Sequence, residues 1–178
     1  MTDQVGRVID NELTISADIC RDLFPSANFF SEAKADEISC ATVDKITISG
    51  REKFRSVIVP GGWYRTNDGG YAKVLRCISV GPDVLPKSTK KRKRENLLAD
   101  RFNIVECQMY RLEGSRFENT YEVLVSSGPV VMAASDLSRP EHVLRHCTRA
   151  GCPGSVVAQG TCTHVEEKVH LVNPFFLK

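Results

Sequence analysis

The chain has 178 residues, of which 42% are hydrophobic and 26% charged, a composition typical of a globular protein and unlike that of a disordered tail. This length favours one domain, alone or with an ordered extension, over two full domains. The charges nearly balance, with 24 Lys and Arg against 22 Asp and Glu. No apolar run approaches the roughly 20 residues of a membrane span, and the first residues do not resemble a secretory signal, so we expect a soluble, intracellular protein without a membrane partner.

The N-terminal part of the chain, residues 1–43, is expected to form an extension that packs on the remainder. A short strand is predicted over residues 11–16, and Ser16 is a typical N-cap for a helix that follows it. A further helical turn is predicted over residues 31–38. The apolar face of the first helix would consist of Ile19, Leu23 and Phe24.

From residue 44 onward, alternating apolar and polar residues predict β-strands. The predicted strands are residues 45–49, 53–59, 63–66, 71–80, 102–112, 120–125 and 130–134. The pair Asp68 and Gly69 supplies the turn chemistry of a tight hairpin. Short strands with little helix indicate a mainly β fold, a small antiparallel barrel or folded sheet with short helices. We expect this β domain to span residues 44–146 and a C-terminal segment to span residues 147–178.

A basic run at residues 87–94 lies between two predicted strands, so it is expected to be an insertion loop of the β domain. Without its six basic residues the chain would hold 18 Lys and Arg against 22 Asp and Glu, a net charge of −4 instead of +2. Unpaired charges are costly to bury, so the run should be exposed. Its basic residues are Lys87, Lys90, Lys91, Arg92, Lys93 and Arg94.

Two functions fit this run. The unbroken basic stretch over residues 90–94 has the density of a nuclear localisation signal, which a nuclear import receptor would bind. The same side chains also suit the phosphates of a nucleic acid, although the rest of the chain offers no extended basic face. A solvated loop without a partner is the alternative to both. We expect a nuclear protein.

The seven cysteines divide into two groups. Four lie in apolar or strand-like surroundings, where a reduced thiol behaves as a small hydrophobic side chain, and are expected in the core. These are Cys20, Cys40, Cys77 and Cys107. The others crowd near the C-terminus beside histidines, and a tetrahedral structural zinc site is chemically sound there, although the spacing departs from that of a standard zinc finger. The candidate zinc ligands are Cys147, Cys152, Cys162 and His164. Reduced thiols beside surface histidines, with no cofactor, are the alternative.

Catalytic motifs are not evident in the sequence. A cysteine nucleophile needs a histidine base and an orienting partner, and the adjacency of His146 and Cys147 in sequence does not establish that geometry. No serine-nucleophile elbow, paired-carboxylate motif or helical zinc-protease motif is present. We therefore expect a protein that is not an enzyme, and a cysteine-dependent enzyme is the alternative.

Aromatic residues are few, and several fall near the predicted hairpin. The candidates for a peptide-binding cluster are Trp63, Tyr64, Tyr71 and Tyr110. Tyr110 is expected to face outward from its strand. Converging rings bind methylated ammonium groups by cation–π attraction. The alternative is that Trp63 anchors the core while the tyrosines cover the edge of the sheet.

Three segments of the β region resemble the bromo-adjacent homology domain, a β-rich module of chromatin proteins, over roughly residues 53–147. The matching segments are residues 71–78, residues 105–113, and residues 121–127 with 130–137, continuing to Val143 and Cys147. The chain departs from the family where Gln108 and Met109 replace a common tryptophan and where Leu112 replaces a proline. Residues 139–147 are also similar to uncharacterised proteins of mushroom-forming fungi.

Members of that family generally act as adapters or histone-tail readers without catalysis, and some use an aromatic cage. The resemblance therefore implies a nuclear, non-enzymatic interaction module that docks on chromatin or on another nuclear protein. A zinc-stabilised nucleic-acid-binding protein, which would use the basic loop and the Cys/His segment, is the alternative.

Overall fold

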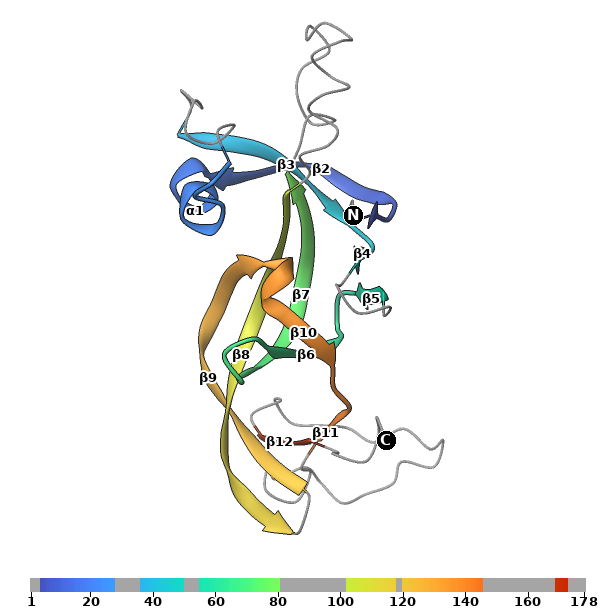
Figure 1. The fold of residues 1–178 in the computed structure, drawn as a ribbon, viewed down its shortest axis with the longest axis vertical. Helices are drawn as coiled ribbons and strands as arrows, with labels where there is room; N and C mark the ends of the chain where they lie inside the picture. The colour runs from blue at the N-terminus through green and yellow to red at the C-terminus, as the bar shows by residue number, and fades with distance from the viewer. Residues whose placement is uncertain are drawn as a thin grey trace, which may run out of the picture.

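The computed structural model describes residues 4–27, 36–49, 55–80, 102–117, 120–145 and 169–172 (Figure 1). These residues form mostly antiparallel strands with one short α-helix, which confirms the predicted mainly β fold. The larger sheet has the strand order β10-β6-β7-β8-β9-β12-β11, with β3 also paired to β7 and β2 to β3, and it does not close on itself. Of the two predicted architectures, the folded sheet is therefore the one observed. No helix in the described part of the chain is long and apolar enough to cross a membrane.

The first strands are β1 (Gln4–Val5), β2 (Val8–Ser16), β3 (Glu37–Val43), β4 (Ile46–Ser49), β5 (Arg55–Ile58), β6 (Trp63–Thr66) and β7 (Tyr71–Val80). The later strands are β8 (Phe102–Phe117), β9 (Thr120–Ala133), β10 (Leu137–Pro140), β11 (Val143–Arg145) and β12 (Val169–Val172). The helical elements are α1 (Ala17–Leu23) and the 3₁₀ turn η2 (Ala134–Asp136). Figure 1 shows β7, β8 and β9 running along the molecule, with α1, β2 and β3 at one end and β11 and β12 toward the other.

The hairpin of β6 and β7 forms as its turn residues predict. Gly69 has a φ angle of +91°, a left-handed conformation that glycine adopts without strain. Asp68 accepts a hydrogen bond from the Thr66 hydroxyl and another from the Gly70 N–H, at 3.3 Å. The turn is thereby held by its own polar groups.

Strand β9 corrects one prediction. Residues 120–125 and 130–134 were expected to be separate strands, but Thr120–Ala133 is continuous and pairs with β8 along its length. The register shifts where Pro129 pairs with Gln108 and Ser127 pairs with Met109. Glycine and proline therefore mark a β-bulge here and do not end the strand, because a bulge absorbs an extra residue while pairing continues on both sides.

A small sheet packs on one face of the large one. Strands β1, β4 and β5 form this separate three-stranded sheet. Ile46 and Ile58 are fully buried in a cluster that includes Val74 and Cys107 of the large sheet. Removing such a side chain from water contributes roughly 1.5–3 kcal/mol, so this cluster is a principal source of stability.

Helix α1 begins as predicted but buries a different face. The Ser16 hydroxyl accepts a hydrogen bond from the Asp18 N–H at 3.3 Å, which confirms the N-cap. Cys20 is completely buried, whereas Ile19 is 37% exposed, so the predicted inclusion of Ile19 in the apolar face was wrong. Cys20 packs with Ile78, from β7, in a second core cluster.

The residues before 44 also contribute strands to the large sheet. Strand β3 pairs with both β2 and β7. Ile38, expected in a helical turn, lies in β3, because tertiary pairing overrides weak local preference. Residues 31–35 of that predicted turn lie outside the described part of the chain.

Candidate functional site

Three of the four candidate aromatic residues lie together on one face of the large sheet. Tyr71 and Tyr110 are register partners across β7 and β8. The ring of Trp63 lies 4.5 Å from that of Tyr110 between centroids, tilted by 49°. Strands β11 and β12 contribute Val143 and Val172 to the same cluster. The predicted convergence of rings is therefore present for these three residues.

Their burial differs from the prediction. Tyr110 is only 4% exposed, so the expectation that it faces outward was wrong. The reason is that β11 and β12 pack over this part of the sheet, an arrangement between distant segments that strand alternation cannot reveal. Tyr71 is equally buried, and Trp63 is partly buried. Peptide binding by these rings stays a prediction, and the aromatic surface they offer to a ligand is mainly that of Trp63.

Tyr64 lies on the opposite face of the sheet, in the cluster that the small sheet covers. Its hydroxyl accepts a hydrogen bond from the Val59 N–H at 2.9 Å and donates one to the Val57 carbonyl at 3.0 Å. Burial raises the pKa of the Tyr64 phenol. These contacts join β5 to β6, which gives Tyr64 a structural role.

Cations of the protein itself lie over two of the rings. The Lys73 Nζ is 5.8 Å from the centroid of Trp63, and the Arg65 Cζ is 5.5 Å from the centroid of Tyr71. Attraction of this kind is worth about 0.5–1 kcal/mol at exposed sites. A methylated ammonium ligand would have to compete with these cations for the ring faces.

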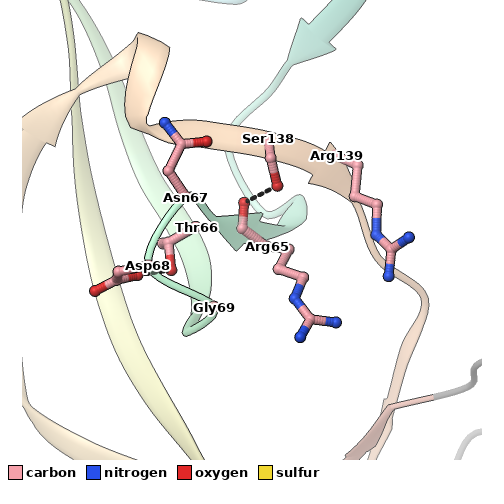
Figure 2. A pocket seen from close by; sticks show the side chains of 7 residues that line it. All are labelled: Arg65, Thr66, Asn67, Asp68, Gly69, Ser138 and Arg139. Atoms are coloured by element: carbon pink, nitrogen blue, oxygen red, sulfur yellow. Dashed lines mark hydrogen bonds between the residues drawn. The ribbon is translucent and has the colours of Figure 1, made fainter.

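An open hollow of about 540 Å³ lies beside this face, between the β6–β7 turn and β10 (Figure 2). Its lining consists of Arg65, Thr66, Asn67, Asp68, Gly69, Ser138 and Arg139. Arg65 and Arg139 are register partners on neighbouring strands, and their side chains extend in the same direction. Figure 2 also shows Asp68 on the far side of the turn from the two guanidinium groups.

The hollow is held in shape by polar contacts between residues far apart in sequence. The Ser138 hydroxyl donates to the Arg65 carbonyl at 3.0 Å, and the Asn67 side chain donates to the Ser135 carbonyl at 3.0 Å. The Thr66 hydroxyl, and after it the Gly70 N–H, keep the pKa of Asp68 below its ordinary value. The turn is thus fixed against the segment that leads into β10.

Sequence reasoning did not select Arg65 and Arg139 as site residues. They are separated by more than seventy positions, and only the pairing of β6 with β10 brings them together. Arg65 stood within a recognised hairpin, beside Trp63 and Tyr64. A basic residue beside aromatic residues in a predicted hairpin is the sequence signal that could have identified Arg65 as a site residue.

The remaining predicted sites lie outside the described residues. These are Lys87, Lys90, Lys91, Arg92, Lys93 and Arg94 of the basic run, and Cys147, Cys152, Cys162 and His164 of the suggested zinc site. Within the described ranges, no three His, Cys, Asp or Glu side chains are grouped so as to hold a metal ion. Both the nuclear signal and the zinc site stay predictions.

The four cysteines predicted to be core are confirmed as buried free thiols, each with no exposed surface. They are Cys20, Cys40, Cys77 and Cys107. Burial raises the pKa of Cys77 and of Cys107 to about 12. Since the thiolate is the nucleophilic form, these side chains are protonated and unreactive at neutral pH.

Comparisons with protein-family models, with curated proteins and with solved structures found no match for this chain. The resemblance to the bromo-adjacent homology domain therefore rests on the quoted segments alone.

Proposed function

We propose that this protein is a nuclear, non-enzymatic interaction module that docks on chromatin or on another nuclear protein. One observation carries the proposal: the basic run is inserted into a hairpin that does not need it. Val80, at the end of β7, and Phe102, at the start of β8, are register partners. The chain therefore leaves the sheet and re-enters it at neighbouring positions.

A two-residue turn is enough to connect antiparallel strands at such a place. Residues 81–101 occupy this connection instead, and they include the entire basic run. Extending a connection between strands costs little free energy, so a long insertion is tolerated at this position. A function apart from folding, recognition by a nuclear import receptor, accounts for a dense basic sequence at this position.

The proposal also holds that the protein is not an enzyme. The four described cysteines are buried, and burial also raises the pKa of Cys20 and Cys40 to about 11. None of them offers a thiolate to a substrate at neutral pH. The open hollow beside β10 presents two arginine side chains, which suit binding of an anion.

The proposed nuclear localisation signal is tested with a fluorescent fusion of the full chain. Replacing Lys90, Lys91, Arg92, Lys93 and Arg94 by glutamine should move the fusion from the nucleus to the cytoplasm. The matched control places five glutamines at solvent-accessible basic positions in the described part of the chain: Arg7, Arg21, Lys45, Arg76 and Arg111. That control should stay nuclear if the run is recognised as a sequence. Nuclear accumulation of the run variant would refute the proposed signal.

A second variant tests whether the insertion that carries the basic run is needed for folding. Replacing residues 81–101 with Asn-Gly should leave a folded protein whose circular dichroism spectrum and cooperative thermal unfolding match those of the parent. Loss of the fold would show that the insertion is structural. Binding of the parent to DNA that weakens steeply with salt, and that the glutamine variant lacks, would favour the nucleic-acid-binding alternative.

A further inference from the structure

Arg65 and Arg139 face each other across neighbouring strands with like charge. Opposite charges stabilise such cross-strand pairs, and like charges directly opposite destabilise them. In the described part of the chain, no carboxylate lies within ion-pair distance of the Arg65 guanidinium. Among the described residues, the repulsion at this register position is therefore offset only by the ion pair between Arg139 and Glu141.

Arg139 is oriented by a carboxylate on one of its edges. Its Nε donates to the Oε1 of Glu141 at 2.9 Å. The Glu141 side chain is 6% exposed while that of Arg139 is 58% exposed, so the pair has a fixed inner end and an open outer end. A guanidinium has five N–H donors, and contact through Nε leaves terminal donors for a ligand.

The neighbouring polar groups already have partners. The Asn67 N–H donates to the Asp136 carbonyl at 2.8 Å, and the Gly69 N–H donates to the Thr66 carbonyl at 3.0 Å. The Ser138 and Thr66 hydroxyl groups are engaged with Arg65 and Asp68. The two guanidinium groups are the charged donors in the lining of the hollow.

We propose that this hollow binds a single oxyanion, a carboxylate or a phosphate, carried by a polypeptide partner and held between Arg65 and Arg139. A planar guanidinium fork matches either group with two parallel hydrogen bonds. The bound oxyanion would offset the repulsion between the two cations. The carboxylates of Glu141 and Asp68 balance the two guanidinium charges overall, but Asp68 lies on the far side of the turn, so positive charge is concentrated where Arg65 and Arg139 lie.

A nucleic acid fits this hollow less well than a polypeptide. Binding of a phosphate backbone draws on a row of cations, each neutralising a successive phosphate. Here two arginines are accompanied by the carboxylates of Asp68 and Glu141, which would repel further phosphates along a strand. The local charge pattern therefore selects an isolated anionic side chain.

This inference deepens the proposed function, on which it rests, because it names the partner chemistry that an interaction module would recognise. The nuclear localisation signal is tested on residues 90–94 in cells, and the oxyanion site is tested on Arg65 and Arg139 in solution. Either result can fail while the other holds.

The test is an NMR titration of the full ¹⁵N-labelled chain that follows the arginine Nε–Hε resonances. Hexaglutamate, inorganic phosphate and a single-stranded oligothymidylate are the three probes. Hexaglutamate, phosphate or both should shift the resonances of Arg65 and Arg139 to saturation, and the responding probe identifies the oxyanion. Arg65→Gln and Arg139→Gln should each weaken that binding by at least roughly tenfold.

Arg7→Gln is the matched control, since it removes the same charge from an exposed arginine in the segment between β1 and β2. It should change the affinity by less than about threefold. Arg65→Lys, which keeps the charge but not the fork, should fall between the parent and Arg65→Gln. Equal weakening by Arg7→Gln, or no saturable shift at Arg65 and Arg139, would overturn the proposal. Tighter binding of oligothymidylate than of either other probe at these two residues would overturn the assignment to a polypeptide.

Discussion

The two faces of the sheet formed by β6, β7 and β8 consist of alternate residues of the same strands, yet they differ in what covers them. On one face, Tyr64, Val74 and Cys107 lie beneath the small sheet and are at most 4% exposed. On the other, Arg65 and Lys73 stand over aromatic rings beside an open hollow. The first face is covered throughout, whereas the second combines a buried cluster around Tyr71 and Tyr110 with charged groups that stay available to a ligand.

A substitution that leaves a cavity on the covered face should have the largest effect on the free energy of unfolding. Ile46→Ala removes a fully buried side chain between the two sheets, and it should lower the free energy of unfolding by about 2–5 kcal/mol because a cavity remains. Urea denaturation measures this change. Leu75→Ala is the control on β7, where the side chain is 40% exposed, and should cost far less. Similar losses for both variants would contradict the distinction between covered and open positions.

Removal of a single hydroxyl from the covered face should have the next largest effect on the free energy of unfolding. Tyr64→Phe keeps the ring but removes the atom that bonds the Val59 N–H and the Val57 carbonyl. Leaving these backbone groups without that partner should cost about 1–3 kcal/mol. Urea denaturation measures the loss, and amide hydrogen exchange at Val59 should quicken. Unchanged exchange at Val59 would show that the hydroxyl does not hold the end of β5.

The buried thiols of this face predict a loss of stability at alkaline pH. The pKa of Cys107 rises from its ordinary value of 9.0 to about 12 through burial, so between these values the unfolded chain releases a proton that the folded chain retains. Stability from this group is complete below pH 9 and falls as pH rises toward 12, by about 1.4 kcal/mol per pH unit. Chemical denaturation from pH 8 to 11 measures the slope, and Cys107→Ala should reduce it. An identical slope in that variant would contradict the assignment.

The open face should show the smallest change in stability. Arg65→Gln removes like-charge repulsion with Arg139 but also the contact with Tyr71, so the free energy of unfolding should stay the same or rise by up to about 0.5 kcal/mol. Thermal unfolding of this variant beside Arg7→Gln measures the difference. A loss above about 1 kcal/mol would mean that Arg65 serves the fold and not a ligand.

Much of the fold was predictable because its signals are local. Local patterns predicted β4, β6 and β7, and the pair Asp68 and Gly69 predicted the turn between β6 and β7. The interruption predicted in β9 was wrong because turn-forming residues also occur at bulges, and pairing with β8 decides between the two. The apolar environment of the four core cysteines was evident from their neighbours in sequence.

The site was less predictable than the fold. The sequence suggested that aromatic rings gather near one edge, and Trp63, Tyr71 and Tyr110 do so. It did not show that Tyr110 is covered, because the covering strands come from another part of the chain. Contacts within one hairpin follow from local spacing, whereas contacts between hairpins depend on how the sheet is ordered.

The sequence by itself determined most of the strands between residues 45 and 112, where the β6–β7 hairpin turns and that a dense basic run separates residues of β7 from those of β8. Strand alternation and turn conformation involve neighbouring residues only, so they can be read along the chain. Only the tertiary structure decided that Arg65 faces Arg139 and that Tyr64 is sealed beneath the small sheet. Those outcomes depend on pairing and packing between distant segments, where burial and charge are set by neighbours in space.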